Sequence, residues 1–144
     1  MDDSVQASVL VVDDNEFVLE TVAVILAGAD YRVVSCNSAE KALFEFNAHR
    51  FDVILTDFNL PGLSGIDFIK KVRLRDSDVP IVIMTAYMES FRAVDEISEK
   101  VFDSIAKPFR PEKILCSIRN AVNFYRHKMA IKKLEVKKTP RKAP

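Results

Sequence analysis

The sequence predicts a three-layer α/β fold in which a parallel sheet lies between two layers of helices. Short apolar runs rich in Val, Ile and Leu recur along the 144 residues, and segments with helical periodicity separate them. Runs of this kind are typical of parallel strands that are buried on both faces. Strand and helix patterns alternate five times, which predicts right-handed crossovers within one domain of ordinary size.

The first β-α unit is predicted from a strand over residues 8–12, which contains Val9-Leu10-Val11-Val12. A helix is expected from Asn15 to about Ala27, ended by Gly28. Apolar residues with helical spacing define its inward side: Phe17, Val18, Val22, Ile25 and Leu26. The second strand is predicted over residues 31–36.

Capping serines mark the next two helices. Ser38 is suited to be the N-cap of a helix over residues 39–47, and Ser64 to be that of a third helix. Their inward residues are expected to be Ala42, Leu43 and Phe46, and then Ile66, Ile69 and Val72. Between them a strand over residues 51–57 leads into the turn sequence Asn59-Leu60-Pro61-Gly62.

The last two β-α units have weaker sequence patterns than the first three. A strand over residues 79–85 has Pro80 near its start, where a missing N–H is tolerated. A helix over residues 89–100 has little apolar surface, and a fifth strand is expected over residues 101–106. Pro111 can open a final helix that runs at least to Met129.

Composition limits the class of protein. Apolar content is 49% and charged content 29%, and no apolar stretch approaches the length of a membrane span. The start of the chain is polar and does not resemble a secretory signal, so a cytoplasmic location is expected. Cys36 and Cys116 are widely separated and are expected to be reduced, buried thiols.

The net charge of zero is unevenly distributed. From Arg126 onward there are eight basic residues against one acid, Glu135, so this part carries +7 and residues 1–125 carry −7. Two interpretations of the basic tail stay open: a solvated extension of the last helix, or a segment that binds an acidic partner, anionic lipid or nucleic acid. Otherwise nucleic-acid binding is not expected.

Polar residues end four of the apolar runs, and they are the main functional signal. They are Asp13, Asp14, Asp57, Thr85 and Lys107. Because ligands bind at the carboxyl ends of strands in an open parallel sheet, these side chains should meet at one edge. Clustered carboxylates are suited to a hard divalent cation, and a carboxylate can attack phosphorus to form an acyl phosphate. Asp57, at the end of the central strand, is the best candidate for that nucleophile.

Taken together, four motifs resemble the receiver domain of two-component response regulators. They are Val11-Val12-Asp13-Asp14, the segment from Asp57 to Gly65, Met84-Thr85-Ala86, and Lys107-Pro108-Phe109. The resemblance covers roughly residues 8–126. It implies a doubly wound, flavodoxin-like sheet of five strands in the order 2-1-3-4-5.

The resemblance also implies roles for individual residues. Asp57 would take a phosphoryl group from a histidine kinase or phosphotransfer protein. Asp14, Asp57 and the backbone carbonyl of Asn59, assisted by Asp13, would hold Mg²⁺ or Mn²⁺. Thr85 and Lys107 would contact the phosphoryl oxygens, and the Lys107–Pro108 peptide bond would be cis.

One position departs from the family pattern. The aromatic residue that usually works with the threonine as a switch is replaced by Ser104. Phe102 is expected to point to the same face of its strand, but too far along to substitute for that residue. The acceptor chemistry is therefore predicted to be intact, whereas the readout is not predicted to follow the common route.

These observations predict a receiver domain over residues 1–129 and a basic tail over residues 130–144, which begins as a helix extension and then becomes disordered. The chain would act as a signalling phosphoacceptor, not as an enzyme on external substrates, and would pass its signal to a downstream protein partner. Three alternatives stay open: a dehalogenase-type phosphatase, a phosphorylation-independent pseudo-receiver, and a fragment of a longer regulator. The phosphatase would need an acid where this chain has Asn59.

Overall fold

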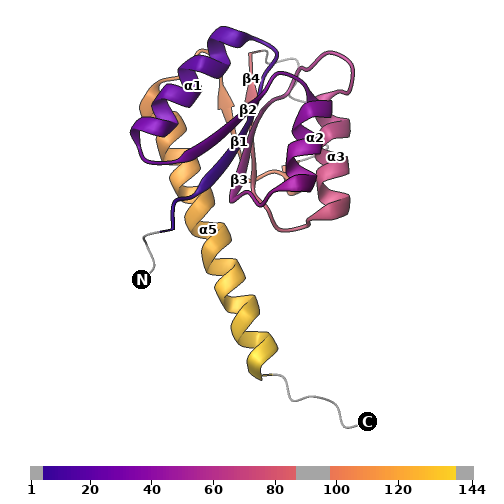
Figure 1. Ribbon diagram of the computed structural model, residues 1–144, viewed down its shortest axis with the longest axis vertical. Coiled ribbons are helices and arrows are strands. Elements are labelled where there is room, and N and C mark those ends of the chain that lie inside the picture. The colour runs from indigo at the N-terminus through magenta and orange to yellow at the C-terminus, as the bar shows by residue number, and fades with distance from the viewer. Residues whose placement is uncertain (1–4, 87–97, 139–144) are drawn as a thin grey trace.

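The structure is a computed structural model that describes residues 5–86 and 98–138. It contains one parallel sheet of five strands in the order β2-β1-β3-β4-β5, which confirms the predicted doubly wound topology (Figure 1). The strands are β1 (Ser8–Val12), β2 (Arg32–Cys36), β3 (Val53–Asp57), β4 (Ile81–Thr85) and β5 (Asp103–Ala106). β3 is central and buried along its whole length.

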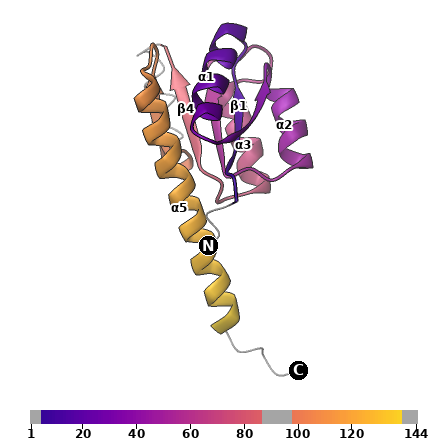
Figure 2. The same cartoon turned by 60° about the vertical axis from the view of Figure 1, so that its left-hand side comes forward.

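In the described part of the chain, four α-helices cover the two faces of the sheet. They are α1 (Glu16–Gly28), α2 (Ala39–Ala48), α3 (Gly65–Arg75) and α5 (Pro111–Lys138). α2 and α3 lie on one face and α1 and α5 on the other (Figures 1 and 2). The side chains of Asn15, Ser38 and Ser64 each accept a hydrogen bond from a backbone N–H of the first turn, so these residues are N-caps.

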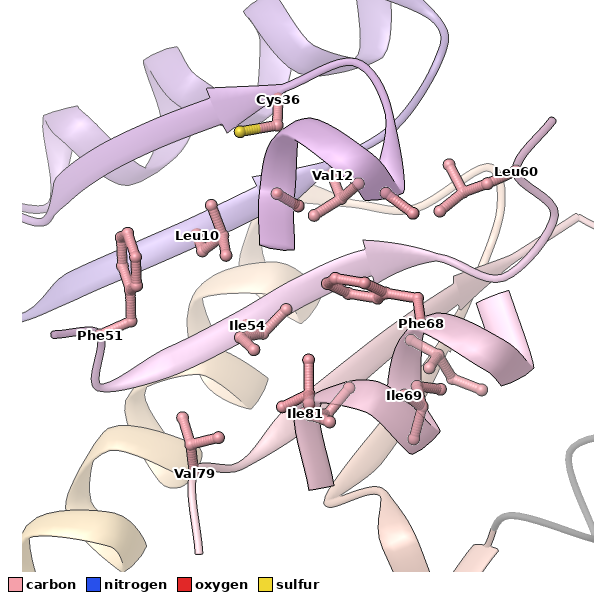
Figure 3. Close-up of a cluster of buried hydrophobic side chains, with 14 of the residues drawn as sticks. Leu10, Val12, Cys36, Phe51, Ile54, Leu60, Phe68, Ile69, Val79 and Ile81 are labelled. Carbon is pink, nitrogen blue, oxygen red and sulfur yellow. The ribbon is translucent and has the colours of Figure 1, made fainter. Parts of the chain in front are cut away.

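The alternation of side chains along each strand produces two hydrophobic cores. Leu10, Ile54 and Ile81 point toward α2 and α3, where they meet Phe68 and Ile69 (Figure 3). On the other face, neighbouring residues of the same strands pack against α1 and α5. Since both faces are covered, the strands read as continuous apolar runs in the sequence.

Some element boundaries differ from the predicted ones. β3, β4 and β5 each begin two residues later than expected. Residues 51–52, 79–80 and 101–102 lie outside the regular pairing of these strands, which starts at Val53, Ile81 and Asp103. Gly28 is the last residue of α1 and does not end it with a left-handed conformation; Asp30 has that conformation instead, at φ 69°. Phe17, expected to point inward, is 75% exposed.

The predicted fourth helix falls mainly outside the described residues, because residues 87–97 are not described. At its end, Ser98–Lys100 forms a single 3₁₀ turn, η3. Arg73 of α3 donates two hydrogen bonds to the carbonyl oxygen of Lys100, at 3.0 and 2.7 Å. This arginine therefore fixes the chain just before β5.

α5 extends well beyond the sheet (Figure 2). It has 28 residues and ends at Lys138, so it includes residues 130–138 of the segment predicted as a basic tail. Lys128 and Lys132 both pair with Asp78 in the loop between α3 and β4, with 3.0 Å between Lys128 Nζ and Asp78 Oδ1. These pairs attach the extension to the body of the domain.

The two cysteines differ in environment. Cys36 is buried, and burial raises the pKa of its thiol to about 11. Cys116 is exposed on α5, so the prediction of two buried thiols was wrong for this residue.

Among the described residues, no helix has the length and apolar character needed to cross a membrane.

Candidate functional site

The predicted site residues come together at the carboxyl edge of the sheet. Parallel pairing aligns Val12 with Thr56, Asp57 with Met84, and Thr85 with Ala106. Asp13, Asp57, Thr85 and Lys107 therefore lie at or just beyond the ends of adjacent strands. This is the edge at which open parallel sheets bind ligands.

Three carboxylates form the acidic part of the site. Oxygen atoms of Asp13, Asp14 and Asp57 all lie within 4.8 Å of one another. Asp13 is fully buried and Asp57 nearly so, whereas Asp14 is exposed. Asp13 Oδ1 accepts a 2.9 Å hydrogen bond from the backbone N–H of Asn15, which orients its carboxylate.

Lys107 provides the positive charge. Its Nζ lies 2.7 Å from Asp13 Oδ2 and 3.2 Å from Asp57 Oδ1. Burial lowers the pKa of this ammonium group, but the hydrogen bonds and negative charges of Asp13 and Asp57 outweigh it, and the pKa is raised overall. Lys107 is therefore a cation throughout the physiological pH range.

Asp57 is the carboxylate of the cluster whose charged form is disfavoured by its surroundings. Burial raises the pKa of its carboxyl group, and the negative charge of Asp13 raises it further. Lys107 and a hydrogen bond with the backbone of Asn59 lower this pKa without reversing the shift. One ammonium group thus leaves the charge of three carboxylates incompletely balanced, and a divalent cation would complete the balance.

The loop after β3 is held close to the sheet. The backbone N–H of Phe58 donates to the Met84 carbonyl at 2.8 Å, and the side chains of Phe58 and Leu60 are buried. A Cβ atom on Gly65 would lie 2.1 Å from the Phe58 carbonyl oxygen. Gly65 therefore allows α3 to start directly against this loop, which keeps Asn59 beside Asp57.

Gly65 was not predicted to have a role. Its signal in the sequence is its position: a glycine directly after an N-cap serine, at the first residue of a helix, where glycine has no advantage for helix formation.

Thr85 and Lys107 are joined through the backbone. The N–H of Lys107 donates to the Thr85 carbonyl at 2.8 Å, so β5 stays paired with β4 up to the site. The Lys107–Pro108 peptide bond is cis, as predicted. Thr85 lies one position beyond the residue paired with Asp57, and its side chain is partly exposed at the mouth of the site.

Phe102 is not on the face that was predicted for it. It lies in a bend before β5, and its ring packs against Phe124 of α5 with 5.3 Å between ring centroids. Ser104 is exposed. The prediction assumed strand alternation from Phe102 onward, but regular pairing starts only at Asp103, so Phe102 does not share the face of Ser104.

Comparison with protein families matches residues 9–119 to the response regulator receiver domain. The chain belongs to this family. The matched range contains Asp13, Asp14, Asp57, Thr85 and Lys107.

Curated relatives of this receiver domain are longer proteins. The DNA-binding response regulator MtrA of Mycobacterium tuberculosis is 32% identical over 117 residues, which cover 81% of this chain and 51% of MtrA. The DNA-binding transcriptional regulator NtrC of Salmonella typhimurium is 27% identical over 128 residues, covering 89% of this chain and 27% of NtrC. The chain thus spans about half the length of MtrA and about a quarter of the length of NtrC.

Solved structures show the same fold. The chemotaxis response regulator CheY4 of Vibrio cholerae superposes with a TM-score of 0.75 at 29% identity, covering 81% of this chain and 99% of CheY4. NtrX of Brucella abortus superposes with a TM-score of 0.84 at 23% identity, covering 97% of this chain and 31% of NtrX. At that identity the likeness to NtrX concerns the fold alone.

Proposed function

We propose that this receiver domain accepts a phosphoryl group on Asp57 from the phosphohistidine of a histidine kinase or phosphotransfer protein. The observation that carries the proposal is the position of the Asp57 carboxylate. It lies at the end of the central strand, 3.2 Å from Lys107 Nζ, with oxygens of Asp13 and Asp14 within 4.8 Å. This arrangement combines a nucleophile, a fixed cation and a cluster of hard ligands.

The transfer is a substitution at phosphorus. An Asp57 oxygen forms the new O–P bond while the P–N bond to the donor imidazole breaks, and the electron pair of that bond stays on the imidazole nitrogen. Lys107 is held where it can donate to one oxygen of the transferred group, and the Thr85 hydroxyl is the candidate donor to another. Charge that develops on these oxygens is thereby met by groups that are already oriented.

The carboxylates fit a divalent cation. Asp14, Asp57 and the Asn59 carbonyl are the proposed protein ligands, with Asp13 assisting, and Mg²⁺ or Mn²⁺ would neutralise phosphoryl charge when bound. Asp14 is exposed, which leaves room for the water ligands that Mg²⁺ retains.

The proposal treats the chain as a switch in signalling, not as an enzyme with external substrates. We assign the receiver to residues 1–129 and the basic tail to residues 130–144, with a cytoplasmic location and a downstream protein partner. Ser104 is exposed, and no hydrogen bond or ion pair among the described residues joins it to Asp57 or Lys107. We therefore assign its replacement of the usual aromatic residue to the readout of the phosphorylated state and not to the transfer itself.

The test is labelling with radioactive acetyl phosphate in the presence and absence of Mg²⁺. Wild-type protein should take up about one phosphoryl group per chain in a Mg²⁺-dependent manner, and Asp57→Asn should take up none. Asp67→Asn, which alters an exposed carboxylate in the first turn of α3, is the matched control and should label normally. Stoichiometric labelling of Asp57→Asn would contradict the proposal.

A further inference from the structure

A second cavity lies at the opposite, amino edge of the sheet. It has a volume of about 700 Å³, and its walls come from the starts of β1 and β2, the loop between α2 and β3, and the middle of α5. We call it the amino-edge pocket and define it by Arg32, His49, Arg50, Asp52 and Arg126. None of these residues takes part in the chemistry at Asp57.

The amino-edge pocket is cationic. Three guanidinium groups line it and Asp52 is its one acidic residue, so its formal charge is positive even when His49 is neutral. The Asp52 carboxylate is already engaged: it accepts a 2.8 Å hydrogen bond from the Ser8 N–H and lies 3.6 Å from Arg126 Nε. Arg32 and Arg50 have no carboxylate within ion-pairing distance in the described part of the chain.

Helix capping does not account for these charges. Arg50 follows the end of α2, where a basic residue stabilises the helix dipole. Arg32, however, begins a strand, and Arg126 lies within α5. Arg126 is also held in place, because its Nη2 donates to the Val5 carbonyl at 3.0 Å. The pocket therefore contains one guanidinium group oriented by a backbone carbonyl, that of Arg126, and two exposed arginines, Arg32 and Arg50.

A smaller hollow continues the amino-edge pocket. Its volume is about 340 Å³, it shares His49, Arg50 and Phe51 with the larger cavity, and it adds Arg75, Asp76 and Tyr125. Arg50 lines both hollows and hydrogen-bonds with Tyr125. Together the two hollows are lined by four arginines against two carboxylates, Asp52 and Asp76, so the formal charge of their lining stays positive.

We propose that the amino-edge pocket binds a small polyanion with two or more linked phosphate groups. Guanidinium groups present paired N–H donors that match phosphate oxygens, and such charge-assisted hydrogen bonds are about twice as strong as neutral ones. Linked phosphates suit the two adjoining hollows because Arg32 and Arg126 line the larger one, Arg75 lines the smaller one, and Arg50 lines both, so each hollow offers guanidinium groups to a phosphate. The site is independent of phosphorylation at Asp57.

The test is isothermal titration of the full chain with pyrophosphate in EDTA, which removes divalent cations from the carboxyl edge. Wild type and Asp57→Asn should bind one pyrophosphate with equal affinity, and added salt should weaken binding. The double variant Arg32→Gln/Arg50→Gln should bind at least about tenfold more weakly, since two charge-assisted contacts are lost. Arg119→Gln, which removes an exposed arginine of α5 outside the pocket, should bind like wild type.

Three results would overturn this proposal. The first is the absence of saturable binding. The second is equal binding by the double variant with its native amide NMR spectrum retained. The third is equal affinity for citrate, which carries similar charge on carboxylates and would remove the assignment to phosphate. All three are separate from the labelling of Asp57, so either proposal can fail alone.

Discussion

At the scale of single residues, Lys107 determines the charge balance of the site before any metal or phosphoryl group is bound. Its ammonium group contacts Asp13 and Asp57, and both contacts lie in a largely buried environment. The charge of these carboxylates keeps Lys107 protonated, but one cation does not compensate three anions. Lys107 thus reduces the repulsion among the carboxylates, and the negative charge that remains favours the binding of a further cation.

The raised pKa of Asp57 predicts that its ionised form destabilises the fold. A carboxyl group whose pKa is higher in the folded state contributes stability at low pH, and this contribution is lost as the pH rises through the folded-state pKa. Asp57→Asn should therefore be more stable than wild type at pH 7 without metal, by something on the order of 1 kcal/mol. The difference should disappear well below the unfolded-state pKa of about 3.9, where the Asp57 carboxyl group of wild type is protonated in both the folded and the unfolded state.

Urea denaturation at pH 7 and at low pH, followed by circular dichroism, measures this difference. Asp67→Asn should be close to wild type at both pH values because its carboxylate is exposed. A less stable Asp57→Asn at pH 7 would show that the ion pair with Lys107 outweighs burial and repulsion.

Gly65 gives a prediction about packing. Gly65→Ala would place a methyl group 2.1 Å from the Phe58 carbonyl oxygen and should destabilise the domain by about 2–4 kcal/mol, because backbone must move. Gly28→Ala is the matched control, since its Cβ would meet nothing within 4 Å and alanine favours the helix. Thermal unfolding of both variants should give opposite shifts, and equal shifts would contradict the close approach.

Asp13, Asp57 and Thr85 could be predicted from the sequence because each directly follows a buried apolar run. Lys107 follows a strand in which only Ile105 is buried, so its prediction depended on the Lys107-Pro108-Phe109 motif.

Phe102, Phe17 and Cys116 were not predicted correctly from the sequence. Periodicity states which residues share a face only inside a regular element, and Phe102 lies outside β5. For Phe17, in the first turn of α1, the apolar pattern gives no information about whether the neighbouring layer extends far enough to cover it.

At the scale of elements, α5 combines a buried half and an exposed half. Ile114, Ile118 and Ala121 are fully buried against the sheet, whereas Ile131 and Leu134 are 43% and 57% exposed. The sequence predicted the start of this helix from Pro111, but not its end, because the lysine-rich segment resembles a disordered tail. The carboxylate of Asp78, about 50 residues earlier in the sequence, pairs with Lys128 and Lys132 and stabilises this part of the helix.

Asp78→Asn tests this attachment. The pKa of Asp78 is lowered by its hydrogen bonds with Lys132 and Lys128, so the pairs are present at neutral pH. The variant should show severalfold faster amide hydrogen exchange from Lys128 to Lys138 and unchanged exchange in the sheet. High salt should reduce the difference, since these pairs are exposed. Identical exchange profiles would show that α5 is held by other contacts.

At the scale of the whole molecule, the sheet separates two charged edges. Carboxylates gather at the carboxyl edge and guanidinium groups at the amino edge, about one strand length apart. The alternation of elements predicted the layers, but not the strand order, which came from the resemblance to receivers. The fourth helix stays a prediction, because residues 87–97 are not described.

Metal binding should stabilise the whole domain. Mg²⁺ at about 100 times its dissociation constant should add about 2.7 kcal/mol to the free energy of unfolding if it binds only the folded state. Asp14→Asn should reduce this effect and should not lower the metal-free stability, because it removes one carboxylate from a cluster whose negative charge Lys107 does not fully balance. Thermal unfolding with Mg²⁺ and then EDTA measures it, with Glu20→Gln on α1 as a control. A full Mg²⁺ effect in Asp14→Asn would remove Asp14 from the ligand set.

The length of α5 has a mechanical consequence. A helix of 28 residues is roughly 42 Å long, and only its first half is fixed to the sheet beside the phosphoacceptor edge. If that half rotates by about 10°, the far end moves by roughly 7 Å. A small rotation of the first half would therefore be amplified at Lys138, provided that the pairs of Lys128 and Lys132 with Asp78 open and release the second half.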